Sequence, residues 1–130
     1  MTLGFELSAE SFSRAQLPTL SLETARSLVT VLSQYLPQHK LEVHAPNDVY
    51  AEGKKIGGIL LESPTPQYCV LGIGLNVNNR LSTIPEEFLA ELADRQITSM
   101  FELLGKETDI SRLIGELLEE LGFGTCKPVP

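Results

Sequence analysis

Four glycines inside two apolar, strand-like segments constrain the fold of this chain more than any other feature. Gly57 and Gly58 interrupt the apolar segment 56–61, and Gly72 and Gly74 interrupt the apolar segment that follows it. Glycine weakens the interior of a strand, so its presence there often marks a bulge or a close approach by a ligand or another backbone. The pattern therefore predicts two neighbouring strands that form either one wall of a binding site or a strongly twisted part of a sheet.

Polar side chains border these two strands. Asn47 and Asp48 form a turn after Pro46, Lys55 directly abuts the Gly-Gly strand, and Asn76 follows the second pair of glycines. A carboxylate, two amides and a lysine around glycine-bearing strands indicate a site, but each also has a plainer interpretation. The turn residues can simply bond their own backbone, and a lysine at a hairpin tip is usually solvated.

The remaining pattern predicts an α/β (α+β) domain in which a mixed β-sheet is flanked by helices. Apolar runs bounded by turns predict strands, and apolar residues at three- and four-residue steps predict helices. The expected strands are 2–8, 41–45, 55–62 and 68–78, and the expected helices are 19–36, 100–104 and 108–122, with another that begins at Pro85. Ser21 and either Thr98 or Ser99 are the expected N-caps, and Gly105 is the expected end of the helix 100–104.

The length and the charge of the chain exclude several classes of protein. One domain over 1–122 and a tail over 123–130 account for the 130 residues. The net charge of −7 argues against nucleic-acid binding, and no apolar run is long enough to cross a bilayer. Cys69 and Cys126 lack metal-ligand spacing, so we expect no metal site. We expect Cys69 to be a buried small hydrophobe in a reduced, cytoplasmic protein.

Three motifs, in this order, resemble the catalytic core of biotin–protein ligases. They are Pro46-Asn47-Asp48-Val49-Tyr50, Gly53-Lys54-Lys55-Ile56-Gly57-Gly58-Ile59-Leu60-Leu61-Glu62 and Gly72-Ile73-Gly74-Leu75-Asn76-Val77-Asn78. The family carries a Lys-Trp-Pro-Asn-Asp turn, a Lys/Arg-Lys-aliphatic-small-Gly-Ile-Leu strand and a Gly-Ile-Gly-aliphatic-Asn-Val strand at about this spacing. Lipoate ligases and octanoyl transferases belong to the same superfamily, but the residues of the Pro-Asn-Asp and Gly-Ile-Gly-Leu-Asn-Val motifs favour the biotin branch.

The resemblance implies a two-step transfer in which ATP and biotin give biotinyl-adenylate, and a carrier-protein lysine then takes the biotinyl group. Lys55 matches the lysine that lies against the biotin carboxylate and the α-phosphate. Asp48 matches a turn carboxylate that could accept the proton of the incoming amine, and Asn76 matches the residue that hydrogen-bonds adenine. The implied catalytic residues are Lys55 and Asp48, and the implied ligand- and nucleotide-binding residues are Asn47, Gly57, Gly58, Gly74 and Asn76. ATP and biotin are the implied ligands, with Mg²⁺ as an accompanying ion.

Two departures from the family pattern change what we expect of this chain alone. His44-Ala45 stands where the family has Lys-Trp, and the sequence lacks the Gly-Arg-Gly-Arg loop that closes over the ligand in the family. We therefore expect a truncated catalytic domain that is inactive by itself and needs a complementing polypeptide with that loop, or a second copy as a homo-oligomer. A non-catalytic remnant or a ligand- or protein-binding module is the alternative, and a lipoate- or octanoate-transferring relative is a third.

Overall fold

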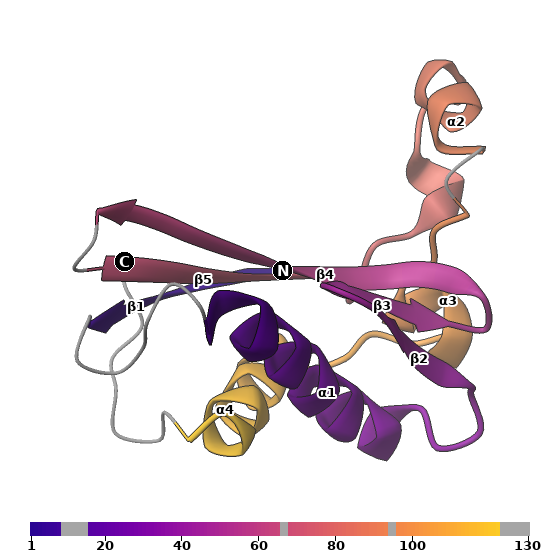
Figure 1. Cartoon of the computed structure of the whole chain (residues 1–130). Coiled ribbons are helices and arrows are strands. Elements are labelled where there is room, and N and C mark those ends of the chain that lie inside the picture. Colours follow the sequence, from indigo (N-terminus) through magenta and orange to yellow (C-terminus); the bar gives the residue numbers. More distant parts are fainter. Residues whose placement is uncertain (9–15, 66–67, 94–95, 123–130) are drawn as a thin grey trace.

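The computed structural model describes residues 1–8, 16–65, 68–93 and 96–122. In chain order the elements are β1 (Thr2–Ser8), α1 (Leu17–Tyr35), β2 (Leu41–His44), β3 (Asp48–Ala51), β4 (Lys54–Thr65), β5 (Tyr68–Leu75), the 3₁₀ turn η2 (Leu81–Thr83), α2 (Glu86–Ala93), α3 (Met100–Leu104) and α4 (Ile110–Glu120). Helices α1 and α4 lie against one face of the sheet, and α2 stands away from the sheet on the other side (Figure 1). The α+β class expected from the sequence is confirmed.

The five strands form one sheet in the order β1-β5-β4-β3-β2. Every neighbouring pair of strands is antiparallel, as short reversing turns between β2, β3 and β4 require. The sequence predicted a mixed sheet. In the described residues, the parallel pairing is limited to an isolated bridge between Lys55 and Ile97. Strand β3 was not among the expected strands, because four residues directly after a proline turn carry too little pattern to be separated from it.

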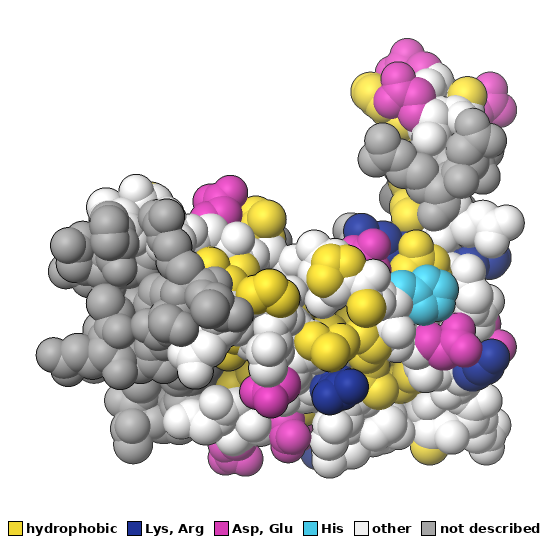
Figure 2. Space-filling view, viewed as in Figure 1, with side chains coloured by type: hydrophobic (Ala, Val, Ile, Leu, Met, Phe, Trp, Pro, Cys, Tyr) yellow, Lys and Arg dark blue, Asp and Glu magenta, His cyan; other side chains and the backbone are white. Residues whose placement is uncertain are grey.

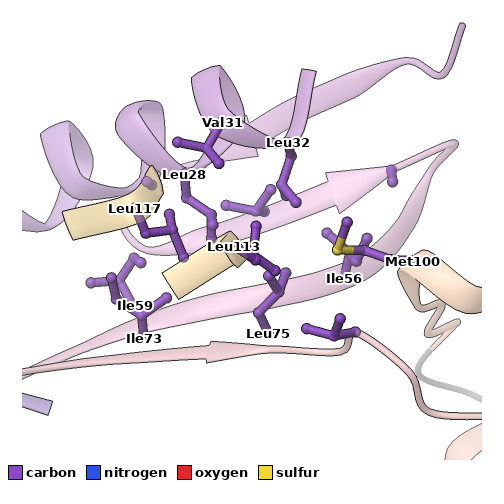
Figure 3. Packing of buried hydrophobic residues seen from close by; sticks show 14 of the residues in the cluster. Leu28, Val31, Leu32, Ile56, Ile59, Ile73, Leu75, Met100, Leu113 and Leu117 are labelled. Atoms are coloured by element: carbon purple, nitrogen blue, oxygen red, sulfur yellow. The ribbon is translucent and has the colours of Figure 1, made fainter. Parts of the chain in front are cut away.

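Helices α1 and α4 bury the hydrophobic core against the sheet (Figure 3). Leu28 and Leu32 of α1 and Leu113 and Leu117 of α4 are fully buried, together with Ile73 of β5. Burying a leucine or isoleucine side chain is worth about 1.5–3 kcal/mol relative to leaving it in water. Both helices therefore lie on the same face of the glycine-bearing strands.

Helix α1 begins earlier than the sequence indicated. Gln16 occupies its N-cap position, and the chain is helical from Leu17 onward. The expectation that Ser21 caps the helix is therefore wrong, because Ser21 lies inside the helix, where it is buried. The helix ends at Tyr35, just ahead of Pro37, as the sequence predicted.

Caps set the ends of the two C-terminal helices. Ser99 caps α3, since its Oγ accepts a hydrogen bond from the Glu102 N–H at 3.1 Å. Gly105 ends α3 with φ at 69°, in the left-handed region that glycine adopts without strain. Both of these ends were expected. Helix α4 begins at 110 rather than 108, because Asp109 accepts a hydrogen bond from the Arg112 N–H at 3.2 Å and occupies the cap.

The described residues also bear on membranes, metals and cysteines. No helix among them is both long and apolar enough to span a membrane. They hold no group of three or more His, Cys, Asp or Glu side chains that could bind a metal ion. Cys69 is fully buried, as expected, and burial raises the pKa of its thiol. Cys126 and the expected tail 123–130 lie outside the described residues.

Candidate functional site

A bulge between β3 and β4 brings the candidate residues onto one face of the sheet. Asp48 lies opposite Gly58, whereas Tyr50 lies opposite Lys55, so Ile56 is an extra residue in β4. Side chains of a regular strand alternate between the two faces, and a separation of three residues would place Lys55 and Gly58 on opposite faces. The extra residue shifts this alternation. Asp48, Tyr50, Lys55 and Gly58 therefore share the face that α1 and α4 leave uncovered, which we call the open face.

Lys55 and Asp48 form an ion pair on the open face. The Lys55 Nζ atom lies 3.0 Å from Asp48 Oδ1, and the two side chains are 42% and 32% exposed. Figure 2 shows basic and acidic side chains next to one another near the base of the projecting α2. An ion pair this exposed adds only about 0–1 kcal/mol to stability, so its main effect is to hold the ammonium group in place. The structure thus brings together the two residues that the resemblance makes catalytic.

The glycines of β4 and β5 differ in what surrounds them. A Cβ atom on Gly58 would lie 3.4 Å from Asp48 Oδ1 and 3.6 Å from Lys55 Cε, so this glycine keeps the space beside the ion pair open. Gly74 is paired with Gly58 and is exposed. Gly57 is buried, and a Cβ atom there would lie 2.7 Å from the Gly74 carbonyl oxygen. Gly58 and Gly74 therefore line the open face, whereas Gly57 permits close backbone packing away from it.

Both asparagines of the expected site use their amide nitrogens inside the protein. Asn47 Nδ2 donates to the Ile59 carbonyl oxygen at 3.1 Å, and the Ile59 N–H donates to the Asn47 carbonyl oxygen at 2.8 Å. Asn76 Nδ2 donates to the Thr98 carbonyl oxygen at 3.1 Å. The side chain of Asn47 thus ties its turn to β4, a structural role that differs from the plainer interpretation, in which it would bond the backbone of its own turn. Asn76 lies just beyond β5, and its Oδ1 atom has no hydrogen bond to the residues that the structure describes.

The sequence reasoning missed an aromatic pair next to the ion pair. The rings of His44 and Tyr50 are stacked, with centroids 3.9 Å apart and an angle of 20° between the planes. His44 lies opposite Asp48 in the β2–β3 pair, and Tyr50 lies opposite Lys55 in the β3–β4 pair. Period-two alternation would have placed these side chains on one face if β3 had been recognised as a strand.

Comparison with known proteins identifies the family that the chain resembles in sequence. The sequence model of the biotin/lipoate A/B protein ligase family matches residues 1–76, which is more than half of the chain and includes Asp48, Lys55 and Asn76. The chain is 42% identical over 76 residues to the biotin–[acetyl-CoA-carboxylase] ligase of Mycobacterium tuberculosis, covering 58% of this chain and 25% of that protein. It is 32% identical over 81 residues to the bifunctional ligase/repressor BirA of Bacillus subtilis, covering 59% and 23%.

Solved structures of biotin protein ligases have a similar fold. The apo enzyme of Aquifex aeolicus matches with a TM-score of 0.77 and 30% identity, covering 95% of this chain and 51% of that chain. The Aquifex aeolicus enzyme in complex with biotin and ATP matches with a TM-score of 0.74 and 29% identity, covering 95% and 48%. The Leishmania major enzyme in complex with biotinyl-5-AMP, at a TM-score of 0.67 and 20% identity, shows the fold alone. The chain matches about a quarter of the length of the curated relatives and about half of the length of these structures.

Proposed function

This chain belongs to the biotin/lipoate A/B protein ligase family, and on that premise we propose that its open face binds biotinyl-adenylate during ATP-dependent biotinylation of a carrier protein. The observation that carries the proposal is the Lys55–Asp48 ion pair beside Gly58, on a face that α1 and α4 do not cover. A cation held next to a floor without side chains suits the approach of an anionic ligand.

Each part of the ligand has a counterpart on the open face. The Lys55 ammonium would offset the negative charge that develops at the α-phosphate. Leu60, which is 59% exposed, would contact the apolar part of the acyl group over Gly58 and Gly74. The Oδ1 atom of Asn76 would accept a hydrogen bond from the exocyclic amine of adenine. These three contacts follow one another across β4 and β5, which supports an extended ligand lying across both strands.

The proposed reaction has two steps. A biotin carboxylate oxygen attacks the α-phosphorus of ATP, the bond to the bridging oxygen of the β-phosphate breaks, and pyrophosphate leaves. The amine of a carrier-protein lysine then attacks the acyl carbonyl, AMP leaves, and the proton of the amine passes to the Asp48 carboxylate. Mg²⁺ would accompany the triphosphate. It is usually bound by one or two carboxylates together with substrate phosphates, and the described residues hold no preformed group of three or more such ligands.

The proposal also includes the partner proteins that the reaction requires. Because the chain matches only part of the length of its relatives, we expect a complementing polypeptide or a second copy to complete the site and a biotin carrier protein to receive the acyl group. A non-catalytic ligand-binding module is the second candidate. The observation that favours it is that the amide nitrogens of Asn47 and Asn76 already have partners in the protein.

Calorimetric titration tests the proposal with a non-hydrolysable biotinyl-adenylate analogue, biotin, ATP and the corresponding lipoyl-adenylate analogue. We expect the biotinyl-adenylate analogue to bind most tightly, and Lys55→Ala to weaken its binding by about 1.5–3 kcal/mol, the size of a charge-assisted contact. Lys54→Ala is the matched control, because it removes the same charge from an exposed neighbouring residue. Absence of binding to the wild-type chain, or equal losses in the two variants, would overturn the proposal. Tighter binding of the lipoyl analogue would move it to the lipoate branch.

A further inference from the structure

The stacked rings of His44 and Tyr50 lie at one side of the Lys55–Asp48 ion pair. Cross-strand pairing sets His44 opposite Asp48 and Tyr50 opposite Lys55, so all four side chains belong to the same face of three neighbouring strands. Gly58 has no side chain, so it does not restrain the ion pair from the β4 side. The aromatic pair is therefore the nearest bulky group on this face at the β2 side of Asp48.

We infer that the His44–Tyr50 stack positions the Asp48–Lys55 ion pair, and that its aromatic rings rather than the charge of His44 perform this role. The inference rests on the proposed function, to which it adds two positioning residues that contact neither adenylate nor acceptor. Tyr50 belongs to the first family-like motif, whereas its stacking partner His44 stands at a position where this chain departs from the family turn.

The position of Asp48 explains why it needs such support. Asp48 is the first residue of β3, directly after the turn 45–47, and β2 is the edge strand of the sheet. The end of a hairpin at a sheet edge opens more readily than the sheet interior. A stacked aromatic pair across two strands resists this opening, because such pairs add to stability beyond their buried area. The stack joins β2 to β3 at the end of the hairpin that carries Asp48.

The charges around the stack do not explain its geometry. Glu42 lies opposite Tyr50, and its Oε2 atom is 3.5 Å from His44 Nε2. The Glu42 carboxylate is also 2.8 Å from the Lys40 ammonium, and this hydrogen bond is the main cause that lowers the pKa of Glu42. Glu42 therefore has its own cationic partner whether or not His44 is protonated. A neutral ring at position 44 should keep the stack.

Amide hydrogen exchange, followed by NMR, tests the inference without any ligand. The reporter is the Ile59 N–H, which donates to the Asn47 carbonyl oxygen and closes the turn before Asp48. We expect His44→Ala to speed its exchange about tenfold relative to amides of β5, because the hairpin end opens more often.

Three further variants control for other effects of the substitution. His44→Phe should restore the wild-type rate. His39→Ala is the matched control, since His39 pairs with Glu52 at the other end of the hairpin. Tyr50→Leu, which keeps an apolar side chain without a ring, replaces His44→Ala if that variant does not fold.

Calorimetry with the biotinyl-adenylate analogue then measures the effect on the site. We expect about a fivefold loss of affinity in His44→Ala and none in His44→Phe, since only the first removes the restraint on the ion pair. Unchanged exchange in His44→Ala, or an equal defect in His44→Phe, would overturn the inference. A wild-type chain that fails to bind the analogue counts against the proposed function instead, and the exchange rates still decide whether the stack positions the turn.

Discussion

Gly57 and Gly58 are neighbours with opposite structural requirements. As adjacent residues of β4 they face opposite sides of the sheet, so that Gly58 belongs to the open face and Gly57 is buried against the backbone of β5. The sequence pattern predicted that these glycines permit close approach by a ligand or another backbone; close approach of a backbone is confirmed at Gly57, and approach of a ligand at Gly58 stays a prediction. The pattern could not tell which of the two glycines shares a face with Lys55, because this depends on a one-residue shift in strand pairing.

Alanine at the two positions should therefore have different effects. Gly57→Ala places a methyl group 2.7 Å from the Gly74 carbonyl oxygen, so we expect a loss of about 1–3 kcal/mol in the free energy of unfolding. Gly58→Ala makes contacts of 3.4 Å or longer, so stability should stay within about 1 kcal/mol of wild type. It should nevertheless weaken binding of the biotinyl-adenylate analogue, because the methyl group occupies the floor of the site. Urea denaturation and calorimetry measure the two effects, and similar stabilities for the two variants would contradict the assignment of faces.

Tyr35 provides a residue-scale prediction that does not depend on the site. Burial, followed by the neighbouring Glu116 carboxylate, raises the pKa of Tyr35 to about 12. The fold thus favours the neutral phenol. This contribution to stability is complete below the pKa of an unfolded tyrosine, about 10, and is lost as the pH rises through about 12. Ultraviolet titration of phenolate absorbance should show a late step that Tyr35→Phe removes, and the same late step in Tyr35→Phe would assign it to another tyrosine.

At the scale of elements, the sequence predicted the helices and strands that have a clear local pattern, and it missed the features that depend on pairing between strands. Helix α4 and the strands β1, β4 and β5 appear close to the expected ranges, because their apolar residues follow one period over many positions. Strand β3 and the bulge opposite it were missed, since each is defined by its partner strand. The His44–Tyr50 stack was missed for the same reason, as it connects two strands across a turn.

Substitutions in helix α4 test which of its faces packs against the core. Leu113 is fully buried in the core, whereas Ile110, one turn earlier, is 38% exposed. Leu113→Ala should lower the free energy of unfolding by about 2–5 kcal/mol through lost burial and the cavity that remains. Ile110→Ala should cost less than about 1 kcal/mol, because much of that side chain already contacts water. Chemical denaturation of both variants decides the matter, and equal losses would mean that α4 does not pack through the Leu113 face.

For the whole molecule, the resemblance predicted the family, and the family model together with the matching folds confirms it. The resemblance also led us to expect a complementing chain and a homo-oligomer, and these stay predictions. They concern surfaces between chains, which the periodicity of one sequence does not encode. The described residues supply a physical reason for such contacts: β1 and β2 are the edges of the sheet, and Leu60, Phe88 and Leu89 are large apolar side chains that lie exposed.

We therefore predict that the chain self-associates at micromolar concentration. Unpaired strand edges and exposed apolar side chains favour pairing, while the net charge of −7 opposes it through repulsion between copies. Added salt screens that repulsion, so association should strengthen between about 0.05 and 0.5 M salt. Light scattering over a concentration series should give masses above the 14.3 kDa of one chain. Leu60→Asp should lower them if copies meet through the open face and leave them unchanged if they meet through a sheet edge. A mass of one chain at every concentration and salt would contradict the prediction.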